Sequence, residues 1–189
     1  QTTGTASSNA SASYASTATS GGSSAFSSNA ASASITVTNV NDAPTITNAA
    51  TVTLAGTNED TTSSGTLVSS LLTSATWADV DSGAVSGIAI TSVSGNGTWQ
   101  YSTDGVTWSD FGAVSGNSAL LLDSGSQVRY VPDGQNGESA SFGFKAWDQT
   151  TGTASSNASA SYASTATSGG SSAFSSGAAS ASITVTNVN

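Results

Sequence analysis

The chain contains no cysteine, methionine or histidine among its 189 residues. Without thiols or imidazoles it can form neither disulfide bonds nor a thiolate zinc site. A nucleophile activated by a histidine, as in Ser-His or Cys-His pairs, is excluded for the same reason. The composition therefore argues against most hydrolase, redox and transition-metal chemistry, and we expect the protein not to be an enzyme.

Basic residues are nearly absent. Arg129 and Lys145 stand against eleven acidic residues, which gives a formal net charge of -9. Such a chain is poorly suited to neutralise phosphates or to bind an anionic membrane surface, so we expect no nucleic acid as a partner. No apolar run approaches the length needed to cross a bilayer, so we expect no membrane insertion. Divalent cations are better candidate partners.

An internal repeat is the most informative feature that is present. Residues 149–189 repeat residues 1–41 with one difference, Gly177 in place of Asn29, so equivalent positions are 148 residues apart. A period near the usual domain size indicates an array of whole domains rather than a short-period solenoid. We therefore predict that residues 42–189 form one complete repeat, and that residues 1–41 are the C-terminal hairpin and last strand of the preceding repeat.

Residues 1–41 have too few large apolar groups to form a core alone. Their sizeable apolar side chains are those of Tyr14, Phe26, Ile35, Val37 and Val40. Because an isolated two-stranded ribbon is marginal in water, we expect the segment to complete a sheet of another copy, by chain continuity or by strand exchange between molecules. The expected partners are neighbouring copies of the same repeat, arranged head-to-tail.

Short β-branched and aromatic runs separated by Gly, Asn, Asp and Ser recur along the chain, and no segment sustains apolar spacing of three and four residues. This pattern predicts an all-β sandwich. Two sequences suit tight hairpin turns, Asn96-Gly97 and Asp104-Gly105, because these residue types tolerate a positive φ. The candidate strands are residues 45–47, 51–54, 66–72, 87–93, 98–102, 106–109, 119–122, 127–131, 139–147 and 180–188.

About thirty residues separate the strand ending near Trp147 from the final strand, too many for an ordinary loop. Ala158, Ala160 and Tyr162 alternate with serine, and residues 168–171 supply a turn. These features predict a long Ser/Ala-rich β-hairpin inserted before the last strand. A flexible Ser/Ala/Gly loop explains the composition equally well.

The linker sequence Asn39-Val40-Asn41-Asp42-Ala43-Pro44, after an ITVT strand, resembles the DxNDxAP linker of cadherin-like domains in giant bacterial adhesins. Further motifs follow in the family order: Glu59-Asp60-Thr61, Asp79-Val80-Asp81, GTWQYSTDGVTW and VRYVPDGQNGESASFGFKAWDQTTG. Residues 42–189 are thus similar to the cadherin-like or Ig-like tandem repeats of such adhesins (VCBS or RTX-adhesin type). The resemblance implies an Ig-like β-sandwich, extracellular at the bacterial cell surface, serving attachment, biofilm or fibre formation.

The resemblance also implies calcium at the junctions between repeats. Carried over to this sequence, the ligands are Asn41, Asp42, Glu59, Asp79, Asp81 and Asp148. Asn39 departs from the family, which often has a carboxylate there, and this should weaken binding or reduce the number of ions. Calcium takes six to eight oxygen ligands, and carboxylates at i and i+2 of an extended chain lie on one side. Each acid taken singly is also explained as a solvated loop or Asx-turn residue.

The function that these observations favour is that of a structural repeat, a spacer or polymerising bead in an adhesin or fibre. The alternative is a carbohydrate-binding β-sandwich module, in which the four tryptophans would stack on sugars. Trp99 and Tyr101 lie two residues apart in a predicted strand. Core packing against Phe142 and Phe144 explains that pair better than an exposed sugar-binding face.

Overall fold

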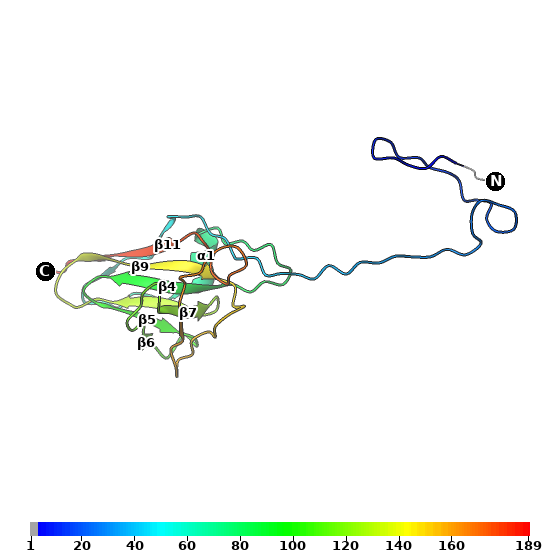
Figure 1. Cartoon of the computed structure of the whole chain (residues 1–189). Helices are drawn as coiled ribbons and strands as arrows, with labels where there is room; N and C mark the ends of the chain where they lie inside the picture. The colour runs from blue at the N-terminus through cyan, green and yellow to red at the C-terminus, as the bar shows by residue number, and fades with distance from the viewer. Residues whose placement is uncertain (1–3) are drawn as a thin grey trace. The chain divides into compact units, whose positions relative to one another are not determined.

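The computed structural model describes residues 4–189 and divides the chain into two compact units, one ending at Asn39 and the other spanning Val40–Asn189. All named strands and the helix belong to the second unit, whose layers are visible in Figure 1. Within residues 4–39 there is no strand or helix, only the isolated bridge between Ser8 and Ser11.

The larger sheet of the second unit has seven strands. Six follow the order β1-β11-β9-β4-β7-β10, and β2 also pairs with β11. The two short strands β1 and β2 run parallel to β11, and the other pairs are antiparallel. The strand bounds are Thr51–Thr53 (β1), Thr57–Asn58 (β2), Gly87–Ser94 (β4), Ala119–Asp123 (β7), Glu138–Trp147 (β9), Tyr162–Ala163 (β10) and Ala179–Thr186 (β11).

The smaller sheet has four antiparallel strands in the order β3-β8-β5-β6. Their bounds are Thr66–Leu67 (β3), Thr98–Ser102 (β5), Ser109–Asp110 (β6) and Gln127–Val131 (β8). The helix α1, Val68–Ser74, follows β3 directly and is seven residues long. No helix within residues 4–189 combines the length and hydropathy that crossing a membrane requires.

A single large core lies between the two sheets. Trp99 of β5 meets Phe142 of β9 edge to face, with ring centroids 4.9 Å apart, and also packs on Tyr130 of β8 at 4.8 Å. Ala181, Ile183 and Val185 of β11 are buried in the same core, all at or below 3% exposure. The predicted all-β fold, mostly sheet in two packed layers, is therefore confirmed, as is the core position of Trp99 and Tyr101.

The larger sheet is also covered on its outer face. Ala119, Leu120, Leu121 and Leu122 of β7 are all fully buried, as expected for a continuous apolar run in a strand covered on both sides. A second apolar cluster forms outside the sheet, where residues of β4, β7 and β9 pack against the chain after β9. Its buried members are Ala89, Ala119, Leu121, Trp147, Ala173 and Phe174.

The main strands agree with the sequence prediction to within one or two residues, but the prediction for residues 66–72 was wrong after Leu67. The chain there turns into α1, whose buried side chains are Val68, Leu71 and Leu72, followed by buried Ala75. These positions lie at i, i+3, i+4 and i+7, the spacing of one helix face. The pattern is only two turns long, so it does not stand out among serines and threonines.

The predictions for residues 45–47 and 106–109 were also wrong. Thr45 makes only an isolated bridge to Ala78. Val106 is 80% exposed, and β6 begins later, at Ser109. The reason is local: the carboxylate of Asp104 accepts hydrogen bonds from the backbone N–H groups of Val106 and Thr107, at 2.8 and 2.7 Å, so the turn extends past Gly105.

The Asn96-Gly97 turn does not form a hairpin. It joins β4 of the larger sheet to β5 of the smaller one, so the strands on either side of it are not paired with each other. The Asp104-Gly105 turn does join paired strands, β5 and β6, and Gly105 has the expected positive φ of 74°.

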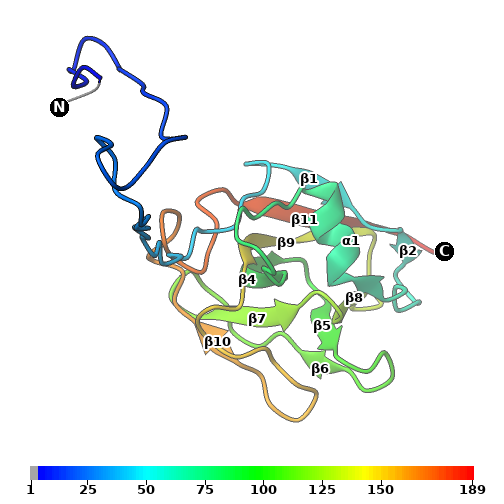
Figure 2. The ribbon, with the colours of Figure 1, turned by 90° about the vertical axis from the view of Figure 1, so that its right-hand side faces the viewer.

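The predicted long hairpin after β9 is not present either. The chain crosses the outer face of the larger sheet and adds only the two-residue strand β10, which pairs with β7 rather than with another part of the insertion (Figure 2). The segment is nonetheless anchored, because Ser155, Thr165, Ala173 and Phe174 are buried. Its alanines and serines are small enough to pack on the sheet, and that contact replaces the pairing that a free hairpin would need.

Candidate functional site

Five of the six predicted calcium ligands lie at the end of the unit where the chain enters it, in two hydrogen-bonded groups that adjacent residues of the linker, Asn41 and Asp42, join. The side-chain amide of Asn41 donates to Asp148 Oδ2 at 2.9 Å. The backbone N–H of Asp42 donates to Asp81 Oδ2 at 2.8 Å, and that of Asp81 donates to Asp79 Oδ1 at 2.9 Å. We call these five residues, from the linker, the loop between α1 and β4, and the end of β9, the entry cluster.

Hydrogen bonds from the protein already occupy many of the side-chain oxygens of the entry cluster. Asp148 is 3% exposed, and its Oδ1 accepts from the backbone N–H and the hydroxyl of Thr150. Asp79 is different: its Oδ2 is buried without a hydrogen-bond partner. A buried carboxylate oxygen left without a partner needs an explanation, and a cation is one. Within residues 4–189, however, no three acidic side chains come close enough together to hold a metal ion.

Glu59, the sixth predicted ligand, does not join this cluster. Its backbone N–H donates to Thr186 O at 3.0 Å, and its Oε1 accepts from the backbone N–H of Val188 at 3.0 Å. It therefore lies where the chain leaves the unit. Strand β9 separates the two groups, since Glu138 at its start pairs with Val185 whereas Asp148 follows its last residue. Ten residues of strand extend about 30 Å.

A second candidate site is the surface that residues 152–189 cover, which we call the acceptor surface. It consists of the edge of β9 next to β11 and the outer-face side chains of Ala89, Leu121, Lys145 and Trp147. Lys145 Nζ donates to Ser168 Oγ and to the carbonyl oxygen of Ser175, both at 3.1 Å. This surface therefore combines apolar contacts with a cation that binds loop carbonyls.

Hydrogen bonds hold residues 173–175 alongside the last residues of β9. Ala146 and Ser175 exchange hydrogen bonds, from Ala146 N to Ser175 Oγ at 2.9 Å and from Ser175 N to Ala146 O at 3.0 Å. Asp148 N donates to Ala173 O at 3.1 Å. Phe174 thereby reaches the cluster that contains Leu121 and Trp147. The sequence analysis missed this role, although a continuous apolar strand at residues 119–122 indicated a sheet covered on both faces.

The two copies of the repeated segment share their local turns. Gly21 N donates to Phe26 O at 2.7 Å, and Gly169 N donates to Phe174 O at the same distance. The bridge between Ser8 and Ser11 recurs between Ser156 and Ser159. Their glycines agree as well, with φ of 74° and 57° at Gly21 and Gly22 against 73° and 58° at Gly169 and Gly170. These turns thus form in both copies.

The copies differ in burial and in strand formation. Ile35 is 88% exposed and Val37 is 84% exposed, whereas their equivalents Ile183 and Val185 are 2% and 3% exposed. Residues 31–38 are in no strand, whereas the equivalent residues form β11. The first copy therefore presents, uncovered, the apolar residues that the second copy buries.

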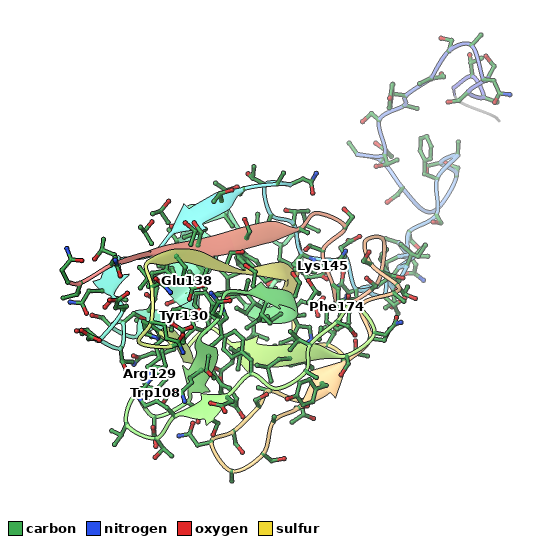
Figure 3. All side chains as sticks on the ribbon, turned by 90° about the vertical axis from the view of Figure 1, so that its left-hand side faces the viewer. Trp108, Arg129, Tyr130, Glu138, Lys145 and Phe174 are labelled. Atoms are coloured by element: carbon green, nitrogen blue, oxygen red, sulfur yellow. The ribbon has the colours of Figure 1, made fainter. Side chains whose placement is uncertain are left out.

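The four tryptophans do not form a common sugar-stacking face. Trp99 and Trp147 are buried, at 4% and 1% exposure. Trp108 keeps some surface, but the guanidinium of Arg129 lies 4.1 Å from its ring centroid, and Arg129 also donates two hydrogen bonds to Gln100 Oε1. Figure 3 shows Arg129 and Trp108 side by side. One ring face of Trp108 is therefore already occupied.

A buried tyrosine, Tyr130, binds the connection between β4 and β5. The hydroxyl of Tyr130 donates to Glu138 Oε1 and accepts from Gly97 N at 2.6 Å. Glu138 Oε2 accepts from Asn96 N at 2.8 Å, so Tyr130 and Glu138 together fix the connection between the two sheets. Burial raises the pKa of Tyr130 to about 12, and the hydrogen bond to Glu138 acts in the same direction.

We predict that Tyr130 limits stability at alkaline pH. Its folded pKa lies above the unfolded value of about 10, so its contribution is complete below pH 10 and is lost as the pH rises toward 12, by at most about 3 kcal/mol. Tyr130→Phe should unfold more easily at pH 7, by about 1 kcal/mol, but lose less stability between pH 8 and 11.5. Urea unfolding across this pH range measures both effects, and an equal alkaline loss in the two proteins contradicts the assignment.

Comparison of this chain with protein-family models, with curated proteins and with solved structures gives no match.

Proposed function

We propose that this chain is a structural repeat of an extracellular bacterial adhesin or fibre, a bead that acts as a spacer in cell-surface attachment or matrix. One observation carries the proposal: the second copy of the repeated segment is an integral part of unit 40–189, as β11 and as the cover of the outer face. The same segment stands in front of the unit with one residue changed. A segment that completes one unit and precedes the next is what a tandem array of units contains.

The path of the chain through the unit supports this proposal. The chain enters beside Asp148, where Asn41 is bound, and leaves beside Glu59, at the other end of β9 (Figure 1). Units joined at these two ends extend in line, as a spacer requires. Together with the linker and the other motifs, this arrangement favours an Ig-like or cadherin-like sandwich. The composition supports a role without catalysis, since it has no histidine or cysteine.

Calcium belongs to the same proposal, at the junction between units. Of the proposed ligands, Glu59 alone lies at the opposite end of the unit from the entry cluster, and within residues 40–189 of one unit no three acidic side chains are close enough to hold an ion. In a tandem, Glu59 and the Asn187-Val188-Asn189 exit of one unit come next to the entry cluster of the following unit. The chemistry fits, because the donors are carboxylate and amide oxygens and Asp79 Oδ2 has no partner. The cation would supply charge neutralisation there and stiffen the linker.

A tandem of two copies of residues 42–189 is expected to melt several degrees higher in calcium than in chelator. Saturating a site to 100 times its Kd stabilises by about 2.7 kcal/mol, and each kcal/mol raises the Tm of a domain of this size by about 2–4 °C. The matched control is the same tandem with Asp79→Asn and Asp81→Asn in the second copy, which should show no shift. Equal melting temperatures of the unaltered tandem with and without calcium reject the ion.

The structural role itself is tested on the source cells. Antibodies raised against residues 42–189 are expected to label intact, unpermeabilised cells, and the coding sequence around this segment should show further copies at the 148-residue period. Labelling that requires permeabilisation argues against a surface role. Unrelated sequence on both sides argues against an array. The carbohydrate-binding alternative has no comparable support, because two of the four tryptophans are buried and Arg129 occupies one ring face of a third, Trp108.

A further inference from the structure

We propose that residues 4–41 are a donor segment, which docks on the acceptor surface of another copy of the repeat in the place that residues 152–189 occupy in this chain. The inference rests on the proposed function and specifies the partner of a structural repeat. The proposal gives the uncovered apolar residues of the first unit a defined binding surface, the acceptor surface of another copy, and a defined pairing register on that surface.

The donor segment already has the conformation that docking requires. Its turns have the same hydrogen bonds and the same glycine conformations as those of the docked copy. Ser24 Oγ, for example, both accepts from Phe26 N and donates to Phe26 O, as Ser172 Oγ does with Phe174. Docking therefore requires little ordering of the turns, and the remaining change is the pairing of residues 31–38.

The acceptor offers both backbone and side-chain partners. The docked strand β11 pairs antiparallel with β9 from Ala179, opposite Phe144, to Val185, opposite Glu138. It pairs on its other side with β1 and β2. Without such a strand the edge of β9 is open, and open sheet edges bind extended chains. The donor supplies the matching face, since Ile35 and Val37 replace Ile183 and Val185 at the same spacing.

The donor segment cannot dock on its own unit. In the docked position Asn39 and Val40 would take the places of Asn187 and Val188, beside Glu59. The next residues, Asn41 and Asp42, are held at the entry cluster by Asp148 and Asp81. About 30 Å of strand β9 separates the two places, whereas consecutive Cα atoms are 3.8 Å apart. The acceptor must therefore be another copy, either the preceding unit of an array or a second molecule.

The one difference between the copies is Gly177 in residues 152–189, which we call the unit's own tail, against Asn29 in the donor segment. It favours docking of the tail over docking of the donor segment. A Cβ atom added at Gly177 would lie 3.0 Å from the carbonyl oxygen of Ile46, closer than side chains normally pack. Relaxation there is restricted, because Ala49 N donates to Ala178 O and Ala178 N donates to Asn48 Oδ1. A donor with Asn29 fits this place less well than Gly177. The donor is thus expected to dock where the acceptor's own tail has been weakened, and Asn29→Gly should improve it.

The test uses the full chain with its own tail weakened by Ile183→Asp and Val185→Asp. Because the donor segment is intact, each molecule can complete the next, and the variant is expected to form head-to-tail oligomers by sedimentation velocity with native near-UV circular dichroism. Adding Asn29→Gly should lower the protein concentration needed for half-assembly at least several-fold. Adding Ile35→Asp and Val37→Asp instead should abolish assembly and leave unfolded monomers. Ile35→Asp with Val37→Asp alone should leave a folded monomer.

Two results overturn the proposal: a tail-weakened variant that remains monomeric, or oligomers that survive Ile35→Asp and Val37→Asp. The register is tested with an engineered disulfide, since the chain has no cysteine. Ser34 is equivalent to Ser182, which pairs with Ser141, so the tail-weakened variant with Ser34→Cys and Ser141→Cys should form a covalent ladder.

The matched control moves the first cysteine to Ser32, two positions along the strand, and should crosslink at least ten-fold less. Equal crosslinking in the two pairs contradicts the register. Failure of assembly leaves the proposed function standing, because that depends on surface labelling and on the 148-residue period of the coding sequence, which these variants do not affect.

Discussion

Replacing Phe142 with alanine is expected to lower the free energy of unfolding of unit 40–189 by about 4 kcal/mol. Phe142 is 1% exposed in β9. Its ring meets Trp99 at 4.9 Å and Phe111 at 5.6 Å, both edge to face, and Phe144 at 6.0 Å. Truncation removes the side chain that joins the aromatic groups of both sheets and leaves a cavity that the surrounding strands cannot fill. Domains of this size are stable by only 5–15 kcal/mol, so this is a large share.

Urea unfolding followed by tryptophan fluorescence measures this loss, because buried Trp99 reports on the same cluster. Phe142→Leu keeps much of the volume and should cost clearly less than the alanine variant. Val106→Ala is the surface control: its side chain is 80% exposed, and its effect should stay within about 0.5 kcal/mol. A loss below about 1 kcal/mol for Phe142→Ala would show that the two sheets do not pack through this aromatic cluster.

Phe174→Ala is expected to lower the free energy of unfolding by about 3 kcal/mol. Phe174 is 5% exposed and packs with Leu121 and Trp147 on the outer face of the larger sheet. Its loss weakens the apolar contact that holds residues 152–178 on the sheet, although the hydrogen bonds of Lys145 to Ser168 and Ser175 remain. The loss should therefore be accompanied by faster proteolysis of this segment, before the sandwich itself unfolds.

The chain contains a matched control for this prediction. Phe26 is the equivalent residue of the first copy and has the same turn around it, with the same hydrogen bond from Gly21. It belongs to the unit that ends at Asn39, so Phe26→Ala should leave the unfolding of unit 40–189 unchanged. Similar losses from the two substitutions would contradict the assignment of the outer-face cluster as a source of stability.

The predictions that succeeded depend on long, regular patterns. Strands β5 and β8 agree with the sequence prediction at both ends, because alternating side chains and turn residues mark them clearly. The helix α1 was missed because its apolar positions are few and follow a strand-like start at Thr66. Strands β2 and β10 are two residues each and depend on pairing with distant strands, which no local pattern encodes.

The sequence motifs name the residues of the entry cluster but do not predict how those residues are arranged. The motif order singled out Asp79, Asp81 and Asp148 together with the linker. In the structure the linker is hydrogen-bonded to both parts, through Asn41 to Asp148 and through Asp42 to Asp81, which is itself hydrogen-bonded to Asp79. The separation of Glu59 from them follows from the direction of β9 and from the parallel pairing of β2 with β11. Those are tertiary facts, since the sequence distance between Glu59 and Asp79 is shorter than that between Asp79 and Asp148.

The two copies of the repeated segment separate what the sequence determines from what the tertiary structure decides. The sequence alone determines the turns, since Gly21 and Gly169 adopt the same positive φ. Each also donates its backbone N–H to the carbonyl oxygen of the phenylalanine five residues further on. Such turns depend on glycine and serine within a few residues, and hence on short-range contacts. Whether Ile35 or Ile183 becomes part of a strand is decided only by the presence of β9 beside it, because a strand requires backbone partners and apolar cover from other parts of the fold.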